Sequence, residues 1–190
     1  MTLSPNTPFK RINPRAINKR IIESLAAAGA FDLASGCSAF LYALVTADRF
    51  IRSGAYRHIL VVGVETVSRI LPFHDRICAY FGDGAGAVVM EASRQPAGVQ
   101  SFVLGSDGSG AEHLMVRGGG VIYPVSHKMV DDKAMYIEMN GREVFKFATR
   151  VLVEATLQAV DKAGLTLDDI DLLIPHQANL RIIELAARHL

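Results

Sequence analysis

The sequence has little cysteine, almost no net charge and no long apolar run. Its two cysteines, Cys37 and Cys78, are too few for a disulfide framework and lack the paired spacing of a zinc site. With 20 basic and 19 acidic residues, the formal charge of +1 provides no overall field that favours nucleic acid or an anionic membrane. The longest uncharged stretch, residues 33–47, is shorter than the roughly 20 apolar residues that cross a bilayer. We therefore expect a soluble, cytoplasmic protein with free thiols and no metal, nucleic-acid or membrane partner.

The first 25 residues differ in composition from the rest of the chain. Up to Ile22 they contain five basic residues, three prolines and no acidic residue. This composition favours a solvated tail. An organelle transit peptide, which is rich in arginine and poor in acids, is the alternative, whereas the apolar core of a secretory signal is absent.

From about Ala26, short apolar runs alternate with longer helical patterns, which predicts an α/β architecture with largely parallel strands. A helix is predicted from Cys37, because apolar residues recur at helical spacing and Gly54 follows as a C-cap. A longer helix begins after the cap residue Asn140, and a final amphipathic helix begins near Asn179. The predicted strands are residues 30–33, 58–64, 85–90, 99–104 and 170–174, and residues 105–120 are predicted to form a surface excursion.

Cys37 lies between a predicted buried strand and the N-terminus of a predicted helix. Unpaired backbone N–H groups and the helix dipole favour negative charge at that position, so a thiolate there is stabilised and can act as a nucleophile. The same N–H groups can stabilise the oxyanion of a carbonyl under attack. A buried structural cysteine is the alternative interpretation.

His176 occupies the corresponding position in the second half of the chain, directly after a predicted strand and before a helix. A lone histidine after a proline is otherwise a surface or capping residue. However, cysteine and histidine partners in an active site meet in space rather than in sequence. The two strand-to-helix junctions therefore favour a single site that contains both Cys37 and His176.

Other motifs do not point to a different chemistry. The glycine-rich stretch at residues 81–89 lacks the Gly-Lys-Ser/Thr ending of a phosphate-binding loop, and dense backbone packing explains it better. His74, His113 and His127 have no partners at metal-ligand spacing, and we assign them no chemistry.

Five segments together resemble 3-oxoacyl-acyl-carrier-protein synthase III, a condensing enzyme with the thiolase fold. They are FDLASGCSAF around Cys37, the Asp75-Arg76 pair, YFGDGAGAVV from Tyr80, NGREVFKFA from Asn140 and DLLIPHQANLRI from Asp171. The resemblance covers about residues 26–190 and implies a partial thiolase-like α/β fold, with mixed sheets and helices packed between and around them. It implies that residues 26–130 belong to the N-terminal half with the cysteine, and that residues 131–190 begin the C-terminal half with the histidine. Residues 1–25 are unlike the family.

The resemblance implies an acyltransferase that starts fatty-acid synthesis. In the family, the cysteine attacks an acyl-CoA thioester and CoA leaves, and malonyl-acyl-carrier protein then undergoes decarboxylative condensation with the acyl-enzyme. Cys37 matches this nucleophile, and His176 matches the histidine that assists decarboxylation and stabilises the enolate oxygen. The substrates are then an acyl-CoA, expected to be acetyl-CoA, and malonyl-acyl-carrier protein, with no further cofactor.

The resemblance also implies binding residues and a homodimer. Gly141, Phe145 and Asn179 match positions that line the pantetheine channel, and Arg76 matches a residue near the CoA nucleotide. Arg181 resembles the basic residue of the carrier-protein docking patch, where a cation can meet an acidic partner. Family members form homodimers through the sheet edge near residues 58–64.

The chain departs from the family pattern in three places. Ala39 stands where the family usually has glycine. The asparagine partner of the histidine, in a Gly-Asn-Thr-Ser segment, and the glycine-rich strand pair of the oxyanion hole follow the position of Leu190 in the family. The strand-helix unit that precedes the cysteine strand in the family is replaced by residues 1–25. We therefore expect a chain that is truncated at both ends.

Two other hypotheses stay open. An inactive truncated fragment would act at most as a dimerisation or carrier-protein-binding module. A thiolase or hydroxymethylglutaryl-CoA-synthase-like enzyme is the third hypothesis, although residues 176–179 fit the synthase III pattern better. A related polyketide-type pathway is the alternative to fatty-acid synthesis.

Overall fold

The computed structural model describes residues 28–93 and 98–190. The chain divides into two compact units, Met1–Ala34 and Ser35–Leu190, and each is considered by itself. The predictions for residues 1–25 lie outside the described residues. Residues 28–34 of the first unit contain no helix or strand, so the predicted strand at 30–33 is wrong. A strand requires hydrogen bonds to a neighbouring strand, and this segment belongs to neither sheet of the described residues.

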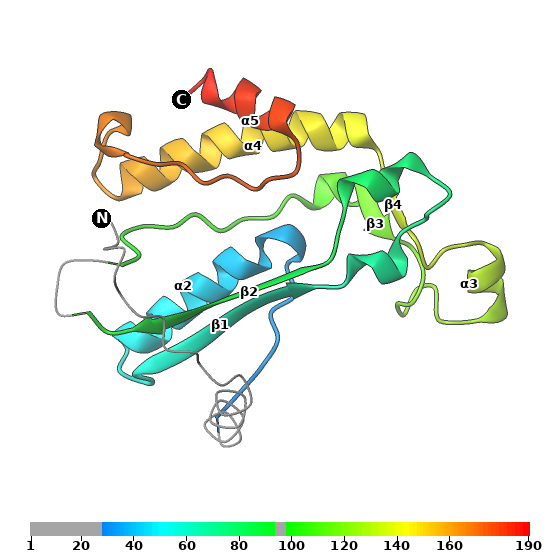
Figure 1. Cartoon of the computed structure of the whole chain (residues 1–190), viewed down its shortest axis with the longest axis horizontal. Coiled ribbons are helices and arrows are strands. Elements are labelled where there is room, and N and C mark those ends of the chain that lie inside the picture. The colour runs from blue at the N-terminus through cyan, green and yellow to red at the C-terminus, as the bar shows by residue number, and fades with distance from the viewer. Residues whose placement is uncertain (1–27, 94–97) are drawn as a thin grey trace, which may run out of the picture. The chain divides into compact units, whose positions relative to one another are not determined.

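A helix and a β-hairpin form the beginning of the second unit. The 3-10 turn η1 (Gly36–Ser38) leads into α2 (Ala39–Arg52), which lies against β1 (His58–Glu65) and β2 (Gly84–Glu91), as Figure 1 shows. The close contact depends on Gly63, because a Cβ there would lie 3.2 Å from the Phe40 ring. On the same face of the hairpin, Val61 is only 4% exposed. The predicted helix and these two predicted strands are confirmed.

The predicted parallel pairing is wrong for the strands that the structure describes. β1 and β2 run antiparallel, with the register His58↔Glu91 at one end and Glu65↔Gly84 at the other. The loop between them contains only the 3-10 turns η2 (Val67–Ile70) and η3 (Arg76–Tyr80). A parallel pair requires a longer crossover, usually through an α-helix, and so this connection returns the chain antiparallel.

The predicted strands at 99–104 and 170–174 are also wrong, since neither segment joins a sheet in the described part of the chain. Residues 98–107 run extended between α2 and the later helix α4 (Gly141–Lys162). Side-chain hydrogen bonds, rather than pairing with a strand, hold this segment. The Tyr42 hydroxyl donates to the Gly105 carbonyl at 3.0 Å, and the Ser101 hydroxyl donates to the Ala159 carbonyl at 2.5 Å. Residues 170–174 are more exposed, with Ile174 at 79%.

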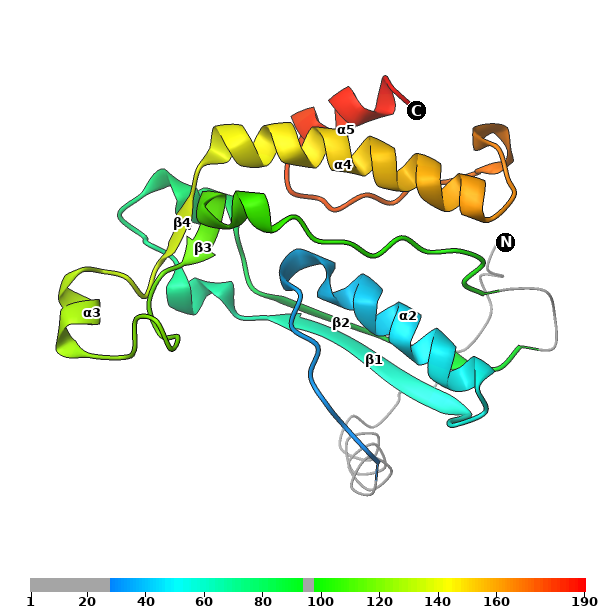
Figure 2. The ribbon, with the colours of Figure 1, turned by 180° about the vertical axis from the view of Figure 1, so that it is seen from behind.

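The two C-terminal helices form as predicted and pack together. Asn140 caps α4, because its side-chain oxygen accepts a hydrogen bond from the Glu143 N–H at 3.3 Å. Asn179 caps α5 (Leu180–Ala187) in the same way, accepting from the Arg181 N–H at 2.9 Å. Figures 1 and 2, from opposite sides, show α5 alongside α4.

A second small sheet precedes α4. Its antiparallel strands are β3 (Leu114–Val116) and β4 (Ile137–Met139), and the 3-10 turn η4 (Gly108–His113) leads into β3. The predicted surface excursion at 105–120 therefore contains η4 and β3. Between the strands, residues 117–136 form a lobe that includes α3 (His127–Asp131). None of the helices in residues 28–93 and 98–190 has both the length and the apolar character that crossing a bilayer requires.

Replacing Gly118 with alanine is expected to destabilise this lobe by about 1–3 kcal/mol, because the added methyl group overpacks its core. A Cβ at this position would lie 2.5 Å from Met129 Cγ and 3.0 Å from the Ala134 carbonyl oxygen, which already accepts the Gly118 N–H. Gly120→Ala is the matched control, since nothing lies within 4 Å of its position. Urea unfolding of the two variants would show the difference, and equal midpoints would contradict it.

Candidate active site

Cys37 lies in the short turn that begins α2. It is the middle residue of η1, and its side chain is exposed. Gly36 has φ +52°, a left-handed conformation that favours glycine. Ser38 closes the turn, since its hydroxyl donates to the Ser35 carbonyl at 2.9 Å. An exposed thiol on a braced turn does not fit a buried structural cysteine.

His176 lies in the extended segment that leads into α5 and is also exposed. Its neighbour Gln177 donates to the Pro175 carbonyl at 3.1 Å, and Asn179 caps the helix that follows. Within the described residues, no hydrogen bond or ion pair joins the side chains of Cys37 and His176. Both are reachable from solvent, and their direct pairing stays a prediction.

The other predicted site residues lie at the beginnings of helical elements. Arg76 is the first residue of η3 and is exposed, while Asp75 caps that turn by accepting from the Ile77 N–H at 3.0 Å. Gly141 is the first residue of α4, and Phe145 follows one turn later, half-buried. Asn179 and Arg181 stand at the start of α5, which packs on α4, so four of the predicted residues lie on one helix pair: Gly141, Phe145, Asn179 and Arg181.

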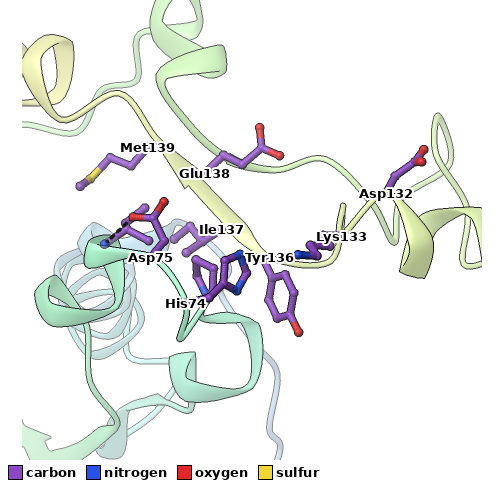
Figure 3. A pocket seen from close by; sticks show the side chains of 10 residues that line it. His74, Asp75, Asp132, Lys133, Tyr136, Ile137, Glu138 and Met139 are labelled. Atoms are coloured by element: carbon purple, nitrogen blue, oxygen red, sulfur yellow. Dashed lines mark hydrogen bonds between the residues drawn. The ribbon is translucent and has the colours of Figure 1, made fainter.

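A pocket of ≈ 340 Å³ opens between the η3 segment and β4 (Figure 3). Its walls come from two parts of the sequence: Pro72, His74, Asp75 and Ile77 on one side, and Asp132, Lys133, Tyr136, Ile137, Glu138 and Met139 on the other. The His74 and Tyr136 rings meet edge to face, with centroids 6.0 Å apart. Arg76 lies within the first segment, and Gly141 follows the second by two residues. The pocket is therefore bordered by segments that carry two of the predicted substrate residues.

Sequence reasoning missed this pocket. Its two walls are far apart along the chain, and His74 was assigned no chemistry because it has no partner at metal-ligand spacing. The available signal was the Asp75-Arg76 pair, which lies within one wall segment, and Asn140-Gly141, which directly follows the other. In the described part of the chain, no cluster of three or more histidine, cysteine, aspartate or glutamate side chains could hold a metal ion.

The acidic groups of the pocket walls already have partners. Asp132 accepts hydrogen bonds from Lys128 Nζ and the Tyr123 hydroxyl, each at 2.5 Å, while Glu138 pairs with Arg117 at 2.6 Å. The Lys128 bond, followed by the Tyr123 bond, lowers the pKa of Asp132, and the carboxylate raises the pKa values of Tyr123 and Lys128.

This cluster stabilises the lobe over a broad pH range. Its acidic contribution is present above the ordinary aspartate pKa of 3.8 and is lost as pH falls through the lowered value. Its basic contribution is present below the ordinary tyrosine pKa of 10.0 and is lost as pH rises through the raised values. Both contributions are therefore present at neutral pH.

The sequence model described as 3-oxoacyl-[acyl-carrier-protein] synthase III matches residues 31–108, and the model of its C-terminal part matches residues 160–190. The chain belongs to the 3-oxoacyl-[acyl-carrier-protein] synthase III family. The predicted resemblance is thereby confirmed. The first match contains Cys37 and the second contains His176, whereas α3, β4 and the start of α4 lie between the two matches.

Relatives named beta-ketoacyl-[acyl-carrier-protein] synthase III support the same assignment. The protein of Caldanaerobacter subterraneus is 47% identical over 164 residues, which cover 86% of this chain and 50% of the relative. That of Halalkalibacterium halodurans is 42% identical over 190 residues, covering 100% of this chain and 55% of the relative. The chain thus spans about half the length of the curated relatives that it matches.

Solved structures of synthase III relatives confirm the predicted thiolase-like fold. The Thermus thermophilus beta-ketoacyl-[acyl-carrier-protein] synthase III has a TM-score of 0.78 at 43% identity, with 96% of this chain and 56% of that chain covered. The priming beta-ketosynthase of the R1128 polyketide pathway has a TM-score of 0.74 at 34% identity, with 96% and 54% covered. The antiparallel hairpin, the helix after the cysteine turn and the paired C-terminal helices are therefore parts of a larger family fold.

Proposed function

We propose that this chain is an acyltransferase of the synthase III type, which condenses an acyl-CoA with malonyl-acyl-carrier protein through an acyl-enzyme at Cys37. The observation that carries the proposal is the exposed Cys37 thiol on a braced turn at the start of α2. A nucleophile needs access to its substrate, and the exposed turn gives the Cys37 thiol that access.

The proposed reaction takes place in two half-reactions. In the first, Cys37 Sγ attacks the thioester carbonyl, a new S–C bond forms, and CoA leaves as a thiolate that takes up a proton. In the second, malonyl-acyl-carrier protein loses CO₂, and the resulting enolate carbon attacks the acyl-cysteine carbonyl. A C–C bond forms, the Cys37 thiolate is released, and 3-oxoacyl-acyl-carrier protein leaves. His176 donates a hydrogen bond to the enolate oxygen in this second step.

Substrate binding follows from the positions of the remaining residues. Gly141, Phe145 and Asn179 line the pantetheine arm, and Arg76, beside the pocket, meets the CoA nucleotide. Arg181 is exposed at the start of α5 and docks the acidic carrier protein. We place this activity in the cytoplasm, at the initiation of fatty-acid synthesis with acetyl-CoA as the starter.

The open edge of β1 supports a homodimer. Among the described residues, β1 pairs with β2 alone, so one edge of this eight-residue strand presents unpaired backbone groups. On the face of the hairpin opposite α2, Val62 and Val64 are 52% and 62% exposed. Pairing of this edge with the same edge of a second copy satisfies the backbone groups and gives the isologous contact of a two-fold dimer.

Incubation with acetyl-CoA is expected to add one acetyl group to Cys37, because the exposed thiol is the proposed nucleophile. Intact-mass measurement followed by peptide mapping would locate the group, and CoA alone is the control. A folded chain that stays unmodified would contradict the proposal. If that chain still binds the carrier protein, the result favours the carrier-binding module.

A further inference from the structure

The loop that joins β1 to β2, residues 66–83, carries Arg76 and one wall of the pocket. The loop residues that line the pocket are Pro72, His74, Asp75 and Ile77. The loop leaves the hairpin where its register ends, at the pair Glu65↔Gly84. The loop contains only two short 3-10 turns, and its position depends on the buried side chains of Leu71 and Ile77 and on how its two ends are held.

One carboxylate closes the base of this loop. Asp83 accepts two hydrogen bonds from Ser68, at 2.8 Å from the backbone nitrogen and at 2.6 Å from the hydroxyl. The bond from the Ser68 hydroxyl, followed by that from its backbone, keeps the pKa of Asp83 below its usual 3.8. The carboxylate is therefore ionised at neutral pH, and hydrogen bonds to an ionised acceptor are stronger than neutral ones.

Two other aspartates of the described residues accept hydrogen bonds from a serine or threonine, but only within their own turns. Asp107 accepts from Ser109, two residues away, and Asp169 accepts from Thr166, three residues away. Asp83 and Ser68 are 15 residues apart, and both stand beside the same end of the hairpin, next to the pair Glu65↔Gly84. Their contact thus closes a loop, whereas the other two each shape a single turn.

We propose that Asp83 is a positioning residue of the acyl-CoA site, which clamps Ser68 and so holds Arg76 and the pocket wall in place. The inference rests on the proposed function, because it takes the pocket side of this loop to contact acyl-CoA. The nucleophile lies outside the loop, on η1. Release of the clamp is therefore expected to weaken acyl-CoA binding and to leave the rate of Cys37 acylation at saturation unchanged.

The test is the dependence of Cys37 acylation on acetyl-CoA concentration, followed by quenched intact-mass measurement. Asp83→Asn and Ser68→Ala are each expected to raise KM about tenfold, with the maximal rate kept within about twofold. The double variant is expected to raise KM no further than either single variant, because both remove the bond between the Ser68 hydroxyl and the Asp83 carboxylate. Ser68→Thr keeps both donors, the backbone N–H and the hydroxyl, and is expected to keep the wild-type KM. Asp169→Asn, which removes the matched carboxylate of a local turn, is the control.

Trypsin cleavage provides a second readout that needs no enzyme activity. Arg69 and Arg76 lie in the loop, and cleavage after them is expected to be several-fold faster in Asp83→Asn and unchanged in Asp169→Asn.

Unchanged KM and unchanged cleavage in Asp83→Asn would overturn the inference, as would a fall in maximal rate at constant KM. If the wild-type chain itself is not acylated, the proposed function fails. The clamp is then supported by faster loop cleavage and overturned by unchanged cleavage.

Discussion

Replacement of Cys37 by alanine is expected to lower acylation by acetyl-CoA about a thousandfold or more, because the chain loses the sulfur that forms the thioester. The structure supports the choice of this cysteine, since its side chain is exposed on the turn before α2. The fold should survive, because nothing in the described part of the chain bonds to the thiol. Mass spectrometry of the variant after incubation with acetyl-CoA measures the effect directly.

The matched control is Cys78→Ala. Cys78 is half-buried within η3, and its loss is expected to leave the acyl group on Cys37 and the rate within about twofold. Circular dichroism of both variants separates loss of chemistry from loss of folding. Acylation of the Cys37→Ala variant at the wild-type rate, or a label found on Cys78, would show that the nucleophile is misassigned.

Replacement of His176 by alanine is expected to separate the two half-reactions. Acylation of Cys37 should continue, whereas condensation with malonyl-acyl-carrier protein should fall by about a hundred- to a thousandfold, the usual cost of removing one donor to a developing oxyanion. The reason is that His176 acts on the enolate, which forms only in the second step. Pre-acylated protein is mixed with malonyl-acyl-carrier protein, and the 3-oxoacyl product is measured by mass.

His127→Ala is the control for this variant. His127 is an exposed residue of α3 without an assigned role, so both half-reactions should keep their rates. A His176→Ala protein that condenses normally would remove the residue from the mechanism. Equal loss of acylation and condensation would instead indicate that His176 acts in the first step, as a base for the thiol.

The local pattern of the sequence predicted single elements well and their pairing poorly. The β-branched run at 58–64 and the helical spacing after Cys37 are local features, and the structure contains both elements. The runs at 99–104 and 170–174 join neither of the two sheets that residues 28–93 and 98–190 form. An apolar run shows that a segment can be a strand, whereas strand formation also requires a neighbour, which no local pattern specifies.

The candidate site shows the same division. Cys37, Gly141 and Asn179 could be located at the starts of helices, because caps and turns have signatures a few residues long. The pocket and the Asp83–Ser68 contact could not be predicted, since both depend on the course of the loop at 66–83. Likewise, the need for glycine at position 118 follows only from the packing of Met129 across the lobe.

The segment at 98–107 is hydrogen-bonded to two helices. Tyr42, on the helix that follows the cysteine turn, holds the carbonyl of Gly105, while Ser101 holds the carbonyl of Ala159 on α4. The helix that follows Cys37 and the helix that begins at Gly141 are therefore both hydrogen-bonded to the same ten residues. Two hydrogen bonds to one segment thus connect the helix after the cysteine turn with the helix that carries Phe145.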